Sequence, residues 1–238
     1  MTLKFEDLTP EQVDGFTMGG RVNVYHMYRD DSGPTPFDVY YTRDKIIEWM
    51  KDAAMNTTRY YGQTDAWLYE ALRKYPITNK TVLIFGSAKP WYESIALSRH
   101  VSMCFVSEYG DRSACHSKIA YLKPEEMRDI KTYAGFSISS FEHSGLGRYG
   151  DPIDVDGDLK AMECASEHIK PGGLLFLSVP IGVDAVVWNC HRIYGVERLD
   201  LLLAKWHVVE TIGLDYHKMY RRTDKCIHQP IFVLRRNL

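Results

Sequence analysis

The sequence contains no cysteine pair at redox or metal-binding spacing, no long apolar run and no block of charge of one sign. Its five cysteines are odd in number and lie far apart, which predicts reduced thiols rather than disulfides. No apolar run approaches the length of a membrane span, and the acidic start MTLKFEDLTPEQVDGF does not have the basic and apolar regions of a signal peptide. We therefore expect a cytoplasmic protein that makes no membrane contact.

The balance of charges limits the partners. The 29 Lys and Arg residues and the 31 Asp and Glu residues give a net charge of −2, and the basic residues are scattered. Nucleic-acid-binding surfaces normally show a basic stripe, so we expect no nucleic-acid partner. With 238 residues, 45% of them hydrophobic, the chain is large enough for one α/β domain with a modest extension. These properties leave the oligomeric state open.

Residues 1–77 are expected to form an extension that packs on the main domain. Residues 1–40 show weak periodicity and many Gly, Pro and Asp residues, which predicts an irregular arm with aromatic side chains packed on the body. Apolar residues then recur at helical spacing over 43–54 and 64–75, and Pro76 ends the second helix.

From residue 78 onward, short apolar strands alternate with helices. This alternation predicts a mostly parallel sheet with helices on both faces, and therefore a Rossmann-like α/β domain over 78–238. The expected strands are 82–85, 101–106, 119–122, 136–141, 174–179, 206–212 and 230–235. The expected helices are 90–99, 123–131, 158–169 (ended by KPGG) and 196–204.

The loop after the first strand of this domain is the first candidate for a ligand site. In open α/β sheets, ligands bind beyond the carboxyl ends of the strands, beside the first strand. Gly86, Ser87 and Ala88 form this loop, and Glu108 lies 22 residues beyond Gly86 at the end of the next strand. An acid at that distance commonly accepts hydrogen bonds from ribose hydroxyls. The alternative is that Glu108 is a solvated acid at a strand end.

The glycine pattern of the loop limits which cofactors it can bind. The NAD and FAD pattern G-x-G-x-x-G falls here on Gly86, Ala88 and Trp91, and a tryptophan does not permit the close packing of the third glycine. The phosphate loop G-x-x-x-x-G-K-[ST] is also absent. The loop therefore favours a nucleoside cofactor without a pyrophosphate, namely S-adenosylmethionine, and disfavours a dehydrogenase. Trp91 is expected to line the methionine end of this cofactor.

Several longer segments resemble known proteins. The last two strands, separated by GLDYHKMYRRTDKCIHQ, fit the antiparallel hairpin of class I methyltransferases, and both HIKPGGLLFLSVPIG and SISSFEHSGLG resemble segments of that superfamily. More narrowly, an uncharacterised domain family described mainly from nematodes is similar over about residues 80–235, in GSAKPWYESIAL, SSFEHSGLGRYGDPIDVDGDLKAM and HRIYGVERLDLLL. The resemblance implies a class I methyltransferase-like fold, with a seven-stranded, mostly parallel sheet whose last strand is antiparallel.

The same resemblance places candidate residues after the fourth strand. Ser139 and Ser140 lie in the loop that contacts the cofactor in this superfamily, and Glu142 and His143 occupy the position of a Glu-His pair found in many members. Transfer of a methyl group to a hydroxyl needs a base, and histidine titrates near neutral pH, so His143 is the expected base and Glu142 its partner. The alternative is that the pair only binds the glycine turns that follow.

Two further segments are candidates for binding the substrate. Arg148, Tyr149 and Asp151 lie in GLGRYGDPIDVDGD, where the arginine is suited to a carboxylate or phosphate. His191 and Arg192 follow the fifth strand, and a salt bridge that holds their loop is the equal alternative. We expect no metal site, because the aspartates of the first segment do not match the EF-hand pattern.

Two functions remain open at this point. The first is an S-adenosylmethionine-dependent methyltransferase that acts on a small molecule or glycan. The second is a methyltransferase-like binding or scaffold protein without catalysis. The second is motivated by the reduced glycine loop and by the acid missing around strand four, where Gly135 and Ser137 flank Phe136.

Overall fold

The computed structural model describes residues 3–31, 40–225 and 228–237. Part of the expected N-terminal arm, residues 32–39, lies outside these ranges. Within them, none of the helices is both long and apolar enough to cross a membrane.

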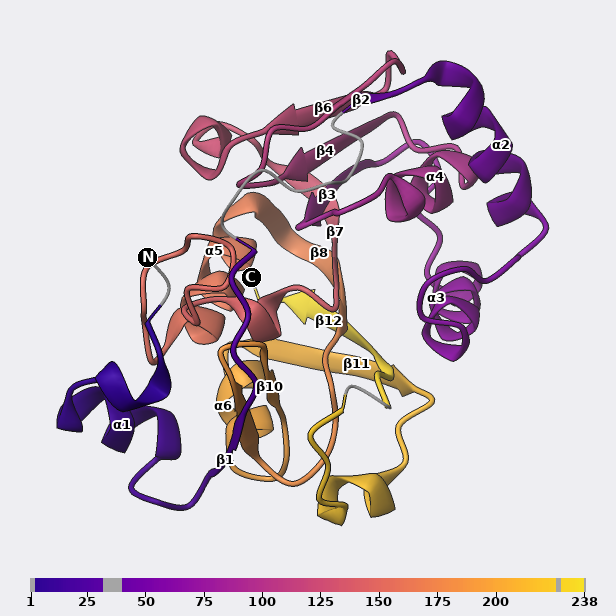
Figure 1. The fold of residues 1–238 in the computed structure, drawn as a ribbon. Helices are drawn as coiled ribbons and strands as arrows, with labels where there is room; N and C mark the ends of the chain where they lie inside the picture. The colour runs from indigo at the N-terminus through magenta and orange to yellow at the C-terminus, as the bar shows by residue number, and fades with distance from the viewer. Residues whose placement is uncertain (1–2, 32–39, 226–227, 238) are drawn as a thin grey trace.

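A seven-stranded sheet forms the centre of the molecule, in the order β11-β12-β8-β7-β3-β4-β6 (Figure 1). In this sheet, β12 runs in the opposite direction to the other six strands. The predicted class I methyltransferase fold is thereby confirmed. The strands are β3 (Thr81–Phe85), β4 (Met103–Ser107), β6 (Ile119–Leu122), β7 (Thr132–Ile138), β8 (Ile169–Ser178), β11 (Trp206–Ile212) and β12 (Ile231–Arg236).

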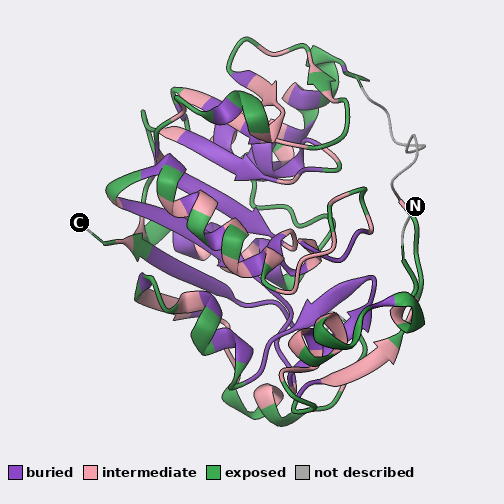
Figure 2. Ribbon diagram, turned by 90° about the vertical axis from the view of Figure 1, so that its left-hand side faces the viewer, coloured by how far each residue is buried: buried purple, intermediate pink, exposed green. Residues whose placement is uncertain are grey.

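Helices cover both faces of the sheet, as its apolar strands require. On one face pack α2 (Arg43–Ala54), α3 (Gln63–Lys74) and α4 (Trp91–Ser98), and on the other α5 (Gly157–His168) and α6 (Arg198–Leu203). Figure 2 shows the second face, where buried strands lie behind helices whose outer surfaces are exposed. Because α2 and α3 belong to the first layer, the N-terminal extension contributes directly to the core of the domain.

Three expected elements differ from the structure. Residues 123–131 form only a short 3-10 helix, η2 (Pro124–Met127). Strand β7 begins four residues earlier than expected, and Phe141 belongs instead to the 3-10 helix η3 (Phe141–His143). Strand β8 runs through KPGG because Ile169 pairs with Thr132, so backbone pairing between strands overrides the local turn signal.

The N-terminal arm is more regular than expected. It contains a 3-10 helix, η1 (Phe5–Asp7), the helix α1 (Pro10–Thr17) and the strand β1 (Asn23–His26). Strand β1 pairs in parallel with β9 (Ala185–Trp188), which is antiparallel to β10 (His191–Ile193). A two-stranded sheet of β2 (Tyr40–Tyr41) and β5 (Ser113–Ala114) and the 3-10 helix η4 (Tyr216–Tyr220) complete the described elements. The three-stranded sheet β1-β9-β10 places the arm beside the segment that follows β8, at the carboxyl edge of the main sheet.

Candidate functional site

The loop after β3 lies against the loop after β7. Gly86 has φ +72°, and a Cβ atom on it would stand 2.4 Å from Oγ of Ser140. Its own N–H donates to the carbonyl of Ser107 at 2.9 Å. Glycine is therefore required both for the left-handed backbone and for the close approach of the two loops. The structure thus brings together the loop predicted from sequence and the candidate serine after the fourth strand.

Glu108 holds the β3 loop in place. One carboxylate oxygen accepts from the N–H of Ser87 at 2.9 Å, and the other accepts from the N–H of Gly110 at 3.1 Å. The carbonyl of Ala88 accepts from the Tyr41 hydroxyl at 3.0 Å. The acid and the glycine loop are therefore adjacent, as the sequence spacing predicts. Each carboxylate oxygen has a second lone pair, which leaves acceptor capacity for a ligand hydroxyl.

Trp91 corrects one of the expected cofactor contacts. Its side chain is fully buried in the helical layer, and its indole N–H donates to Asp65 at 2.9 Å. The ring packs edge-on against Trp49 with centroids 6.1 Å apart. The first turn of α4 directs this residue toward α2 and α3, so Trp91 fixes the extension on the sheet instead of lining the cofactor loop.

A chain of polar side chains lies at the end of β7. Ser139 donates to Oε1 of Glu142 at 2.6 Å, and Nε2 of Gln229 donates to Ser139 at 3.3 Å. Within the described ranges, Oε2 of Glu142 and Oε1 of Gln229 are buried acceptors without a hydrogen-bond partner. Burial raises the pKa of Glu142 to about 7. Two buried oxygens at the end of β7 thus lack a donor among the described residues.

Gln229 was missed in the sequence. It precedes β12, and because β12 is antiparallel its start lies at the edge where the parallel strands end. Recognising the final antiparallel strand was the available signal, since it predicts that a polar residue just before that strand faces the site.

His143 is oriented as a proton acceptor. Its Nδ1 lies 2.6 Å from the carbonyl oxygen of Cys190, and a carbonyl only accepts, so Nδ1 carries the proton and Nε2 keeps a lone pair. Burial lowers the pKa of His143 to about 3, with a further contribution from the charge of Arg148. The ring is therefore neutral at physiological pH. Its Nε2 lies 3.9 Å from Oε1 of Glu142, which is contact without a hydrogen bond.

The residues expected to bind substrate separate into two groups. Tyr149 is 40% exposed and stands edge-on to His143, with ring centroids 5.6 Å apart. The ring of His191 lies 6.4 Å from that of His143, and Arg148 stacks on Tyr149 with 4.8 Å between the guanidinium carbon and the ring centroid. These three residues lie around the candidate base. The other two, Asp151 and Arg192, are held by hydrogen bonds to the backbone.

Asp151 and Arg192 serve the structure of their own loops, which corrects the expectation that they bind substrate. Asp151 accepts from the N–H groups of Gly145 at 2.7 Å and Gly147 at 3.2 Å. Arg192 is only 2% exposed and donates to the carbonyls of Ser144, Asp154 and Val155. A guanidinium with this many buried carbonyl partners has little capacity left for a ligand.

Among the residues that the structure describes, no group of three or more His, Cys, Asp or Glu side chains is placed to hold a metal ion. The arrangement at the carboxyl edge thus combines hydrogen-bond acceptors, a neutral histidine and arginines. Such a set can bind hydroxyl and amino donors and accept a proton.

Replacing Gly86 by alanine is expected to lower the free energy of unfolding by about 1–3 kcal/mol, because the left-handed backbone and the contact with Ser140 both become unfavourable. Gly172→Ala is a matched control, since Gly172 has φ +76° and open space around it. Chemical denaturation should show the larger loss for Gly86→Ala, with part of it recovered by Ser140→Ala. Equal losses at the two glycines would show that the loops do not meet closely.

The chain is similar to solved structures of methyltransferases. An S-adenosylmethionine-dependent methyltransferase from Clostridium acetobutylicum aligns with a TM-score of 0.51 and 10% identity, over 81% of this chain and 98% of that one. The N-methyltransferase NodS from Bradyrhizobium japonicum, in complex with S-adenosylhomocysteine, aligns with a TM-score of 0.51 and 15% identity, over 74% of this chain and 86% of that one. A longer chain from Streptococcus mutans aligns at 11% identity with a TM-score of 0.47, and 48% of its length is covered.

A comparison with curated proteins gave no match. The family model described as "Caenorhabditis protein of unknown function, DUF268" matches residues 79–233. This match spans the whole α/β domain up to the middle of β12, including the β3 loop, Glu108 and the segment after β7. The chain therefore belongs to the DUF268 family and has a class I methyltransferase-like fold.

Proposed function

We propose that this protein binds S-adenosylmethionine and catalyses methyl transfer to a small molecule or glycan. The observation that carries the proposal is the meeting of three features at one edge of the sheet. These are the β3 loop held by Glu108, the buried acceptors of Glu142 and Gln229, and the neutral His143. Ligand sites of open α/β sheets lie at this edge.

The residues present fit the cofactor. An unpaired buried acceptor costs about 1–3 kcal/mol, and the hydroxyl and ammonium donors of S-adenosylmethionine would offset that cost at Glu142 and Gln229. Gly86, Ser87, Ala88, Glu108, Ser139 and Ser140 would hold its adenosyl and amino-acid parts. When bound, the cofactor would supply an electrophilic methyl group on a sulfonium.

The protein's own residues would orient the acceptor and take its proton. His143 presents Nε2 as a lone pair because the carbonyl of Cys190 holds Nδ1. Tyr149, with its ring edge-on to His143, would exclude water from one side of the base. Proton transfer by a positioned base contributes typically about 10²–10⁴ in rate, and the lowered pKa of His143 places its contribution at the lower end of that range, because a base is most effective when its pKa is near the working pH.

One observation favours the second candidate, a binding protein without catalysis. Both carboxylate oxygens of Glu108 already accept from backbone N–H groups of the protein, so its role in the structure is accounted for without a ligand. The first candidate requires that the protein bind the cofactor. Titration calorimetry with S-adenosylmethionine and S-adenosylhomocysteine should show binding, and no heat at high micromolar concentration would exclude the first candidate.

Glu108→Ala is expected to weaken S-adenosylhomocysteine binding by about 10–100-fold, because a hydrogen bond to a charged group contributes about 1.5–3 kcal/mol. Loss of the bond to Ser87 would also loosen the loop that the cofactor contacts. Glu125→Ala, which removes an exposed acid of η2, is the control and should bind normally. Full binding by the Glu108→Ala variant would remove Glu108 from the cofactor site.

A further inference from the structure

The turn between β9 and β10 gathers charged and titratable side chains from distant parts of the chain. Asn189 exchanges two hydrogen bonds with the backbone of Arg29, at 2.8 and 2.7 Å. The carbonyl oxygen of Cys190 contacts Nδ1 of His143 at 2.6 Å and accepts from Nη1 of Arg148 at 3.4 Å. His191 follows directly and faces His143. Three consecutive residues thus place two arginines around two histidines.

The side chain of Arg148 is held in place through Nε and Nη1. Its Nε donates to Asp31 at 2.7 Å, and its Nη1 also contacts Sγ of Cys190 at 3.2 Å. Within the described part of the chain, Nη2 makes no hydrogen bond. Because Nε and Nη1 are held, Nη2 has a defined position beside Tyr149, on which the guanidinium stacks.

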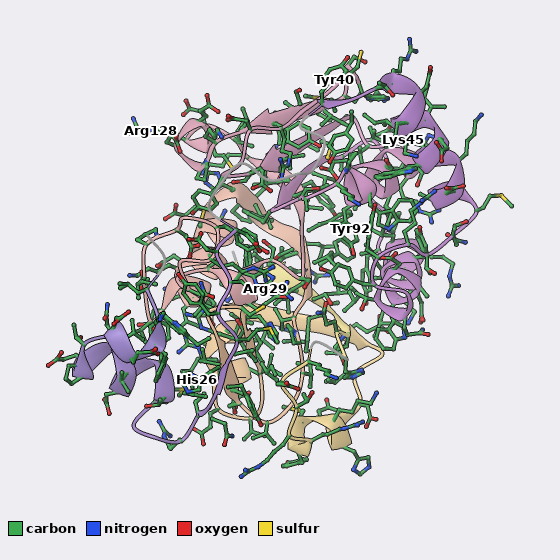
Figure 3. The ribbon with its side chains drawn as sticks, viewed as in Figure 1. His26, Arg29, Tyr40, Lys45, Tyr92 and Arg128 are labelled. Atoms are coloured by element: carbon green, nitrogen blue, oxygen red, sulfur yellow. The ribbon has the colours of Figure 1, made fainter. Side chains whose placement is uncertain are left out.

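Arg29 brings a second guanidinium to this turn. Residues 3–31, 40–225 and 228–237 provide neither an ion pair nor a hydrogen bond to its guanidinium, and the residue is exposed. In the view of Figure 3, the exposed Arg29 lies between the part that contains β3 and β4 and the part that contains β10. The charge of Arg29 acts on His191, and so does that of Arg148.

His191 adds a second buried imidazole ring beside that of His143. The residue is 5% exposed, and its Nε2 is buried without a hydrogen-bond partner among the described residues. Burial, together with the charge of Arg148, lowers the pKa of His191 to about 4, so the ring is neutral at physiological pH. A neutral imidazole has one acceptor nitrogen, which can accept a hydrogen bond from a hydroxyl.

Acidic side chains also lie around this group. Asp31 pairs with Arg148, the charge of the exposed Asp224 acts on His191, and Oε1 of Glu142 lies 3.9 Å from Nε2 of His143. Arg192 adds a third arginine, which is paired with the buried Asp158. Among the described residues, Arg148 and Arg192 are thus each paired with an acid, whereas Arg29 is in no ion pair.

We propose that Arg29 and Nη2 of Arg148 form a binding site for an oxyanion, a phosphate or a carboxylate, carried by the methyl acceptor. This inference rests on the proposed function and names its substrate class, an anionic hydroxy compound. Guanidinium groups match the planar or forked oxygens of such anions. A hydroxyl near the anionic group would donate to His191, and the reacting hydroxyl would face His143.

The test uses inorganic phosphate and acetate as probes, titrated by NMR into the full chain with and without S-adenosylhomocysteine. We expect phosphate or acetate to bind in the millimolar range, and Arg29→Gln to weaken that binding at least about tenfold, the effect of one charge-assisted contact. The stronger of the two probes identifies a phosphate or a carboxylate. Arg29→Lys should retain part of the affinity, because it keeps the charge but not the fork.

Arg128→Gln is the matched control, since it removes the same charge at an exposed position far from Arg29 (Figure 3). Equal weakening by both variants, or no saturable binding of either probe, would overturn the oxyanion site. Binding of the probe at Arg29 by a protein that does not bind S-adenosylhomocysteine would support the site while rejecting the proposed function. Cofactor binding with no effect of Arg29→Gln on the probes would reject the site alone.

Discussion

Asp158→Asn is expected to lower the free energy of unfolding by about 3–5 kcal/mol, because it removes the anion from a buried group that contains two arginines. Asp158 is fully buried and accepts from Nη2 and Nε of Arg198 at 2.5 and 3.1 Å, and from the Tyr194 hydroxyl at 3.0 Å. Nε of Arg192 lies 3.8 Å away. The variant leaves both guanidinium groups buried without their shared partner. Chemical denaturation measures the loss.

The pH dependence of the free energy of unfolding also reports on the buried carboxylate of Asp158. Burial raises the pKa of Asp158, but the charge of Arg192 and the hydrogen bond from Arg198 outweigh burial and hold the pKa below its ordinary value. A lowered pKa stabilises the fold above the ordinary value of about 4, and this contribution is lost as the pH falls through the folded pKa. Asp158→Asn should therefore flatten the acid limb of the stability curve.

Glu163→Gln is the control for this prediction, since it removes an acid from an exposed ion pair with Lys205. Exposed pairs contribute little to stability, so this variant should unfold like the native protein. A loss at Asp158→Asn no larger than that of the control would mean that the two arginines find other partners.

His143→Gln is expected to lower the rate of methyl transfer by at least about 100-fold while S-adenosylhomocysteine binds as before. Glutamine can still donate to the carbonyl of Cys190 but offers no basic nitrogen at the position of Nε2. The measurement is formation of S-adenosylhomocysteine from S-adenosylmethionine with an acceptor that the native protein methylates. It is paired with calorimetry of cofactor binding.

His217→Gln, at an exposed position in η4, is the matched control and should transfer methyl groups normally. A His143→Gln variant that transfers as fast as the native protein would show that His143 is not the base. Parallel losses of transfer and cofactor binding would assign His143 to the structure of the pocket instead.

Much of the fold follows from local sequence patterns. Buried parallel strands read as short apolar runs, and their carboxyl ends meet at one edge, so Gly86, Glu108 and His143 could be placed together without coordinates. The final strand was identified by resemblance. Its antiparallel direction is what also puts Gln229 at that edge.

The fine structure of the site was not predictable in the same way. Trp91 and Arg192 occur in segments whose position near the site was foreseen, yet both side chains turn into the protein. The Trp91 side chain is directed by its hydrogen bond to Asp65 in α3, and the Arg192 side chain by its hydrogen bonds to carbonyl groups just before α5. Contacts between residues so distant in sequence leave no periodic pattern.

The sequence by itself determined the α/β class of fold, the succession of strands and helices along the chain and the edge at which a ligand would bind, because apolar periodicity is a local property. Only the tertiary structure decided which polar groups surround His143. The pairing of β1 with β9 brings Arg29 to Asn189, and the turn at Cys190 fixes the tautomer of His143. Such pairings join irregular segments that lie 160 and 47 residues apart in the chain, and no local pattern of residues records them.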